Sequence, residues 1–353
     1  MGMLERVKAG AFLAASLDMD SPEERGQWQT TKGAECELLA RGVLAISPSK
    51  STGEQKAIVI SAGIHGDETA PMELVQQLAE RLLTGGLYPT HRLLLIIGHP
   101  AAIGCHQRFI EENMNRLFKQ TNPDTTPDAQ RANTLQAVLR DFYAAAPTDA
   151  SQRWHLDLHC AIRDSVHYTF AVSPYSEQPT RSVPLFAFLQ QAEIDAVLLA
   201  NSPSPTFSWF SAAYFGAQAF TLELGKVAPF GENDLTRLAP FYQALVALVT
   251  TPTETKTNTK VLTWQADALA VYKVTRTLVK QSDDFTFSFP NDQANFTFFE
   301  QGALLGKDGD IEYYSLDGGE AIVFPNANVA LGQRAGLLVQ QTEVKVTDQV
   351  TVK

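Results

Sequence analysis

Two residues with metal-binding side chains, His65 and Glu68, lie three positions apart in the segment SAGIHGDETAP, residues 61–71. An apolar run precedes them and a helix-starting pattern follows them. The pair alone is weak evidence for a metal site, because the N-terminus of a helix also favours a negative charge such as that of Glu68. Both interpretations, a metal ligand and a partner of the helix dipole, stay open on this segment alone.

A second histidine, His159, ends the strand-like run WHLDLH, residues 154–159. Two imidazoles and one carboxylate with an open fourth position form a known catalytic zinc set, whereas structural zinc sites usually have four protein ligands that include cysteine. The ligand types therefore favour catalysis. Asp157 lies on the same face of the predicted strand and could orient a metal-binding histidine. The alternatives are a buried, hydrogen-bonded His159 and an Asp157 that only satisfies hydrogen bonds at the strand end.

A further carboxylate, Glu223, lies in the apolar run FTLELG, residues 220–225. A carboxylate in such a strand needs either a partner or a raised pKa. Both conditions suit a general base that takes a proton from water and returns it to a leaving amine. The alternative is a core glutamate in a salt bridge, to Lys226 or to an arginine.

Three polar residues, Arg108, Asn115 and Arg116, cluster in CHQRFIEENMNRLF, residues 105–118, a piece otherwise suited to a loop. Arginine binds carboxylates with two parallel hydrogen bonds, and asparagine can add a neutral donor. The segment therefore predicts an anion-binding element. The alternative is that both arginines are simply solvated at the surface.

The elements that must position these residues follow an α/β pattern. AIVIS (57–61) and LLLII (93–97) are apolar at successive positions, as expected of central strands covered on both faces. Apolar residues at helical spacing predict a helix that begins directly after Glu68, with Pro71 in its first turn. In an open parallel sheet the carboxyl ends of the strands form the ligand-binding edge. The sequence thus predicts a mostly parallel or mixed sheet, flanked by helices, with the candidate residues at one edge.

A Thr-rich polar stretch, residues 250–260, interrupts this pattern. Beyond it, short strand-like runs alternate with Gly, Asp and Asn turns. We therefore expect an α/β catalytic domain over residues 1–250 and a smaller, all-β C-terminal domain over residues 251–353. FSFPNDQANF and SLDGGE in that second domain are either loops that border the cleft or exposed turns.

The composition excludes several classes of partner. The 353-residue chain has a formal net charge of −11 and no basic stripe, which opposes nucleic-acid binding. The three cysteines form no paired motif, the N-terminal stretch is a poor secretory signal, and no apolar run approaches the roughly 20 residues of a membrane span. We expect a protein of a reducing compartment, the cytoplasm, acting without nucleic acid or membrane.

Four segments, GIHGDET, NMNRLF, DLHC and TLELG, occur in this order. Together they resemble the zinc carboxypeptidase superfamily, most closely its branch of succinylglutamate desuccinylases and aspartoacylases. The resemblance covers about residues 56–250, and FPNANVALGQRAGLLV near the end looks like a desuccinylase C-terminal domain. A zinc-carboxypeptidase-like catalytic fold is the implied architecture.

The resemblance also implies residue roles. His65, Glu68 and His159 would hold one zinc ion per chain, and Glu223 would transfer the proton. Arg108 would polarise the scissile carbonyl. Asn115 and Arg116 would bind a carboxylate of the substrate.

This chain departs from the aspartoacylase pattern at three points. Asn113 stands where that branch usually has an acid, WFSAAYFGAQAFTLELG contains no substrate-binding arginine, and the C-terminal tyrosine has no clear match. These differences favour a desuccinylase.

The implied reaction is hydrolysis of N-succinylglutamate to succinate and glutamate, the last step of arginine breakdown by the succinyl route. A deacylase of another N-acyl amino acid, a peptide carboxypeptidase and a non-catalytic zinc-binding protein are the alternatives. The implied partner is a small anionic N-acyl amino acid. The oligomeric state and the native metal are not fixed by the sequence.

Overall fold

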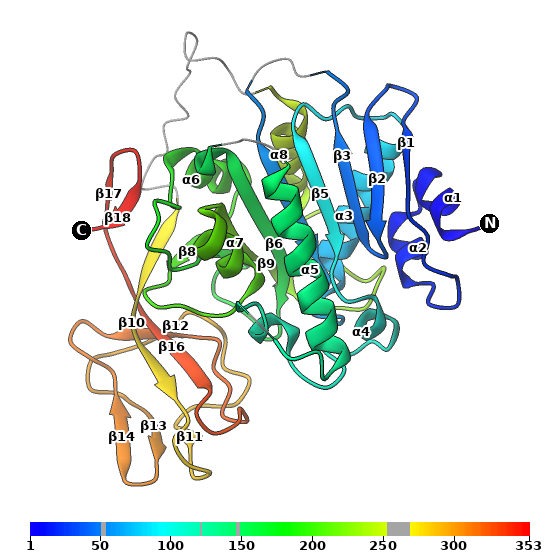
Figure 1. The fold of residues 1–353 in the computed structure, drawn as a ribbon. Helices are drawn as coiled ribbons and strands as arrows, with labels where there is room; N and C mark the ends of the chain where they lie inside the picture. The colour runs from blue at the N-terminus through cyan, green and yellow to red at the C-terminus, as the bar shows by residue number, and fades with distance from the viewer. Residues whose placement is uncertain (51–53, 121, 146–148, 253–268) are drawn as a thin grey trace.

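A 13-stranded mixed sheet runs through the chain in this computed structural model, which describes residues 1–50, 54–120, 122–145, 149–252 and 269–353. Figure 1 shows the sheet with helices on both faces and the C-terminal strands at one side. Its strands, in spatial order, are β1 (Gly26–Gln29), β2 (Glu35–Ala40), β3 (Val43–Ser47), β5 (Arg92–Ile97), β4 (Ala57–Ala62), β6 (Arg153–Ala161), β9 (Gln218–Lys226), β7 (Thr169–Ser173), β8 (Ala196–Leu199), β10 (Ala270–Val279), β16 (Arg334–Gln341), β15 (Glu320–Val323) and β12 (Thr297–Phe299).

The central strands β5, β4, β6 and β9 are parallel to one another. All six residues of β4 are buried, as the unbroken apolar run AIVIS predicted for a strand covered on both faces. Antiparallel strands β1–β3 extend one side of this centre, and β7 joins the other side antiparallel to β9. The predicted fold class, a mixed sheet flanked by helices, is confirmed.

The helices fall on the two faces. The α-helices are α1 (Met3–Lys8), α2 (Phe12–Leu17), α3 (Thr69–Leu83), α4 (Pro100–Gly104), α5 (Pro127–Ala144), α6 (Val183–Gln191), α7 (Phe207–Phe215) and α8 (Ala239–Thr250), with short 3₁₀ turns η1 (Met114–Arg116) and η2 (Ala150–Gln152). Helix α3 starts directly after Glu68, as predicted, and its buried side chains share a core with α6 and α8. Helices α5 and α7 share a second core on the opposite face, with Val59 and Ile96.

The described C-terminal residues, 269–353, contain strands and turns. Besides β10, β12, β15 and β16 these are β11 (Thr286–Phe287), β13 (Leu304–Asp308), β14 (Ile311–Tyr314), β17 (Val344–Val346) and β18 (Val350–Val352). They form a smaller all-β part, as expected, but β10 pairs in parallel with β8 and so continues the main sheet. The expected boundary after residue 250 stays a prediction, because most of the polar stretch that suggested it lies outside the described residues.

Candidate active site

Three candidate ligands meet at the carboxyl ends of the central strands. His65 lies in the turn after β4, Glu68 immediately precedes α3, and His159 is near the end of β6. His65 Nδ1 is 2.9 Å from one Glu68 oxygen, and His159 Nδ1 is 2.7 Å from the other. One ligand atom from each of the three buried residues lies within 4.8 Å of the others. The structure thus brings together the set that the sequence singled out.

The position of Glu68 decides whether it is a metal ligand or a partner of the helix dipole. Glu68 occupies the N-cap position of α3, yet its side chain accepts no hydrogen bond from the helix. The carboxylate instead accepts from the backbone N–H of Cys160 at 3.1 Å and from Arg108 at 2.6 Å, in addition to facing both imidazoles. Glu68 therefore points into the cluster and is not engaged in capping the helix.

The far nitrogen of each imidazole has its own acceptor. His65 Nε2 donates to Asn113 Oδ1 at 2.9 Å, and His159 Nε2 donates to Asp157 Oδ2 at 3.2 Å. This pattern leaves the Nδ1 atoms of both rings facing Glu68. Two such nitrogens and one carboxylate are the donor set of a catalytic zinc site, and the acceptors behind them are of the kind that orient zinc-binding histidines. The residues therefore fit one divalent metal ion.

The charges in the cluster reinforce this fit. Burial opposes ionisation of Glu68, but the charges of His65, His159 and Arg108 outweigh it and hold the pKa of Glu68 well below its usual range. Burial, followed by the charge of Arg108, lowers the pKa of His65 to about 4, which keeps its ring neutral. Burial also disfavours a charged His159, but Asp157 and Glu68 raise its pKa well above the usual range. The site thus has ionised carboxylates facing a position that a cation would share.

Glu223 lies beside His159, because the two residues are Cα partners in the pairing of β6 with β9. Only 7% of Glu223 is exposed, and burial, reinforced by the charge of Glu68, raises its pKa to about 7. The salt-bridge alternative fails, since Lys226 pairs with Asp164 at 3.0 Å and Glu223 has no ion-pair partner among the described residues. A buried carboxylate with a pKa near neutrality is suited to accept and return a proton.

The anion-binding candidates lie on the loop that follows α4. Arg108 reaches the cluster through Glu68, as described above. Arg116 is exposed to solvent and its guanidinium donates to the carbonyl of Asn115 at 2.8 Å; desolvation and the charge of Arg108 lower its pKa. Asn115 is buried; its Oδ1 accepts from the backbone N–H of Phe207 at the start of α7, and its Nδ2 lies 3.5 Å from His159 Nε2. The loop therefore brings Arg108 and Asn115 to the site, with Arg116 beside Asn115, and Asn115 also fixes α7.

A buried residue of α5 that the sequence analysis missed, Asp128, holds this loop in place. Its carboxylate accepts from the backbone N–H groups of residues 110, 111 and 112 and from His99 Nε2, at distances of 2.8 to 3.3 Å. The backbone N–H of Gly66 also donates to the carbonyl of Arg108 at 3.2 Å. A Cβ on Gly66 would lie 2.4 Å from backbone atoms of Ala102 and Gln107, so glycine is required for this approach. The turn that carries His65 and Glu68 therefore packs directly against the loop that carries Arg108.

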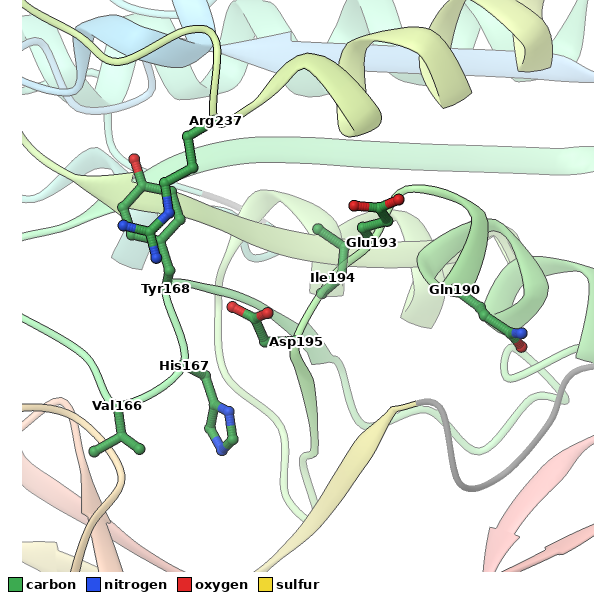
Figure 2. Close-up of a pocket in the computed structure, with 8 residues that line it drawn as sticks. All are labelled: Val166, His167, Tyr168, Gln190, Glu193, Ile194, Asp195 and Arg237. Carbon is green, nitrogen blue, oxygen red and sulfur yellow. The ribbon is translucent and has the colours of Figure 1, made fainter.

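A separate polar cavity of about 540 Å³ lies near the start of β7 and β8 (Figure 2). The residues that line it are Val166, His167, Tyr168, Gln190, Glu193, Ile194, Asp195 and Arg237. None of these was singled out from the sequence, and none belongs to the cluster of metal-binding side chains. The chemistry therefore centres on the strand ends of β4, β6 and β9.

Two family models match the chain. The succinylglutamate desuccinylase/aspartoacylase catalytic domain matches residues 54–249, and the AstE/AspA barrel-sandwich hybrid domain matches residues 267–342. Across the described residues, no helix combines the length and apolarity needed to cross a membrane.

Individual relatives are similar over nearly the whole chain. A succinylglutamate desuccinylase of Vibrio campbellii is 45% identical over 338 residues, which cover 96% of each chain. The crystal structure of the succinylglutamate desuccinylase of Vibrio cholerae has a TM-score of 0.90 at 44% identity and covers 97% of this chain and 98% of that one. The enzyme of the same name from Chromobacterium violaceum has a TM-score of 0.81 at 33% identity, covering 95% and 98%.

Proposed function

This chain belongs to the succinylglutamate desuccinylase/aspartoacylase family of enzymes, and we propose that it is a metal-dependent hydrolase that cleaves N-succinyl-L-glutamate into succinate and L-glutamate. The observation that carries the proposal is the meeting of His65, Glu68, His159 and Glu223 from three distant segments, in a chain whose near-full-length relatives have that name. We also place the reaction at the end of arginine breakdown, as the family resemblance suggests.

His65, Glu68 and His159 would hold the metal ion, for which zinc fits the donor types. Bound zinc polarises a carbonyl oxygen and lowers the pKa of water to roughly 7. Asn113 and Asp157 keep both imidazoles in the orientation that presents Nδ1. His65 in the turn after β4, Glu68 before α3 and His159 near the end of β6 are already close together, so metal binding needs no rearrangement of the strands.

Glu223 performs the proton transfers. It accepts a proton from the water whose oxygen bonds to the succinyl carbonyl carbon, and it then donates that proton to the glutamate nitrogen as the C–N bond breaks. Arg108 donates hydrogen bonds to the carbonyl oxygen as negative charge develops there, a contribution of about 3 kcal/mol for one well-placed donor. Arg116 binds a substrate carboxylate, assisted by the Asn115 amide.

A substrate panel tests the proposal. Purified protein with its metal content measured is assayed on N-succinyl-, N-acetyl- and N-formyl-glutamate and on N-acetyl-aspartate, and N-succinylglutamate is expected to give the highest kcat/KM. Equal or better turnover of an acetyl donor would replace the proposal with a different deacylase. One equivalent of metal with no turnover of any donor would support a non-catalytic zinc protein instead.

Glu223→Gln tests the proton transfer. The amide has nearly the same shape but cannot accept a proton, so metal content is expected to stay at one per chain while kcat falls by about 10³-fold or more. Lys226→Ala, on the same strand but exposed, is the matched control and should leave both measurements unchanged. Near-normal kcat in Glu223→Gln would remove this residue from the mechanism.

A further inference from the structure

Arg334, the first residue of β16, connects the C-terminal strands to the active site through a series of contacts. Its guanidinium lies 5.6 Å from the ring centroid of Phe324, and that ring lies 5.7 Å from the ring of Phe170. Phe170 is the Cα partner of Glu223 in the pairing of β7 with β9, so the two side chains project from the same face of the sheet. The series therefore ends on the strand position paired with the proposed proton-transferring carboxylate.

Hydrogen bonds hold the backbone around Phe324, whose ring lies near the Arg334 guanidinium. Phe324 has a φ of 55°, in the left-handed region that side chains other than glycine rarely adopt. Its backbone N–H donates to Asn295 Oδ1 at 2.8 Å, and Asn295 is buried. Two residues further along, the N–H of Asn326 donates to the carbonyl of Ala335 at 2.7 Å, next to Arg334. Hydrogen bonds at residues 324 and 326 therefore hold the backbone that carries this ring.

The charges around Arg334 are those of the active site. Burial, and then the charge of Arg116, lower the pKa of Arg334 to about 9, while the charge of Glu223 opposes this shift. The charge of Arg108 acts on Arg116 in the same way. Arg334 therefore lies within electrostatic range of Arg116 and Glu223, and Arg116 lies within range of Arg108.

Arg334 makes no ion pair or hydrogen bond through its side chain to any residue that the structure describes, and its one ring contact is with Phe324. Arg108 by contrast is paired with Glu68 at 2.6 Å. A partly buried cation that lacks an ion-pair partner and lies close to a second cation is unfavourable unless an anion joins it. The chain has 39 acidic and 28 basic residues, so Arg334 does not lack a carboxylate partner because acidic residues are scarce.

We propose that Arg334 binds a second carboxylate of the substrate, so that the C-terminal strands complete the substrate pocket. The inference rests on the proposed function, because N-succinylglutamate has three carboxylates: the succinyl one and the α- and γ-carboxylates of glutamate. Arg116 and Asn115 account for one of them, and Arg108 is committed to the scissile carbonyl. Arg334 is a further cation placed to bind another.

Kinetics of Arg334→Met test the proposal, because methionine keeps the apolar stem on Phe324 and removes the charge. KM for N-succinylglutamate is expected to rise about 10- to 100-fold with kcat changed much less, since a carboxylate away from the reacting bond is bound equally in ground and transition states. Arg334→Lys should recover part of the loss. Arg237→Met is the matched control, because Arg237 also lies over an aromatic ring, that of Tyr168 at 3.4 Å, but lines the separate cavity in Figure 2.

Three substrate analogues identify the carboxylate. N-propionyl-glutamate, N-succinyl-4-aminobutyrate and N-succinyl-2-aminobutyrate lack the succinyl, α- and γ-carboxylate respectively. The wild-type protein should discriminate against each analogue, and Arg334→Met should lose its discrimination against one of them. An unchanged KM, or undiminished discrimination against all three analogues, would overturn the assignment.

A binding measurement separates failure of this inference from failure of the proposed function. Calorimetry with uncleaved N-succinylglutamate compares the metal-loaded Glu223→Gln protein with the same protein carrying Arg334→Met. A 10- to 100-fold weaker binding supports the role of Arg334 even if the wild-type protein turns over a different donor faster. Equal binding in the two proteins refutes it even if desuccinylase activity is present.

Discussion

Replacing Asn113 is expected to weaken metal binding without touching a metal ligand. Asn113 Oδ1 accepts the Nε2–H of His65 at 2.9 Å, and this bond holds the ring with Nδ1 toward Glu68. The same oxygen accepts from the backbone N–H of Asn115 at 3.0 Å and so caps the short turn η1. Asn113→Ala removes both bonds, whereas Asn113→Asp keeps an oxygen acceptor for each and adds a negative charge.

The expected size follows from what such supporting groups contribute elsewhere. Loss of a hydrogen-bond partner behind a metal-binding histidine typically lowers metal affinity 10- to 100-fold, equivalent to about 1.4 to 2.7 kcal/mol. Asn113→Ala should fall in that range. Asn113→Asp should bind at least as tightly as the wild type, because a carboxylate behind the imidazole makes Nδ1 a stronger donor.

Competition against a chromophoric chelator of known zinc affinity measures this directly, with no need for turnover. Thermal unfolding of the metal-free proteins checks that η1 has not been lost. Wild-type affinity in Asn113→Ala would show that the amide does not orient His65. Weaker binding in Asn113→Asp than in Asn113→Ala would show that the charge, and not the acceptor geometry, dominates at this position.

Three further predictions concern the supports of the site. Asp128→Asn should lower the free energy of unfolding by about 2 to 4 kcal/mol and raise KM, because the loop carrying Arg108 loses its charged acceptor. Denaturant titration measures the first effect and steady-state kinetics the second. An unchanged KM would show that Asp128 does not support the function of the loop. Gly66→Ala should reduce metal occupancy, measured by elemental analysis, because its Cβ would lie 2.4 Å from backbone; full occupancy would contradict the required approach. Burial lowers the pKa of His155 to about 4, so this residue stabilises the fold above pH 6.5 and the stabilisation is lost as the pH falls toward 4. In the metal-free protein, the free energy of unfolding between pH 6.5 and 4 should depend less steeply on pH in His155→Gln, by about 1.4 kcal/mol per pH unit. Replacement of the exposed His106, in His106→Asn, should leave this pH dependence unchanged.

The parts of the site that the sequence could predict are those encoded locally. The unbroken apolar run of β4 indicates a strand buried on both faces, and the helical spacing after Glu68 indicates where α3 begins. Because parallel strands end at one edge of a sheet, residues that end different strands could be expected to meet. His65 and His159 follow from this reasoning, and so does Glu223, which is the Cα partner of His159.

The parts that the sequence could not predict depend on pairings between distant segments. Asp128 in the first turn of α5 has the pattern of a residue that interacts with the helix dipole, and nothing local shows that it gathers backbone N–H groups of another loop. Asn113 was recognisable only as a departure from a family pattern, because a neutral amide gives no sign of which imidazole it will face. The position of Arg334 requires the parallel pairing of β8 with β10, which joins strands about 70 residues apart and is not specified by either run alone.

The distribution of charge bears on why an acidic protein should select a polyanionic substrate. The net charge of −11 repels anions at long range, but at physiological ionic strength this repulsion fades beyond roughly 8 Å. Within that distance Arg116 and Arg334 have no ion-pair partner among the described residues, and desolvation lowers the pKa of each. If one of these arginines binds the succinyl carboxylate, an acetyl donor leaves that cation unpaired, and a site built for a charged group discriminates strongly against an analogue without it. Selectivity among acyl donors should then depend on that arginine, while the metal-binding residues, which contact the reacting bond common to all donors, should contribute little to it.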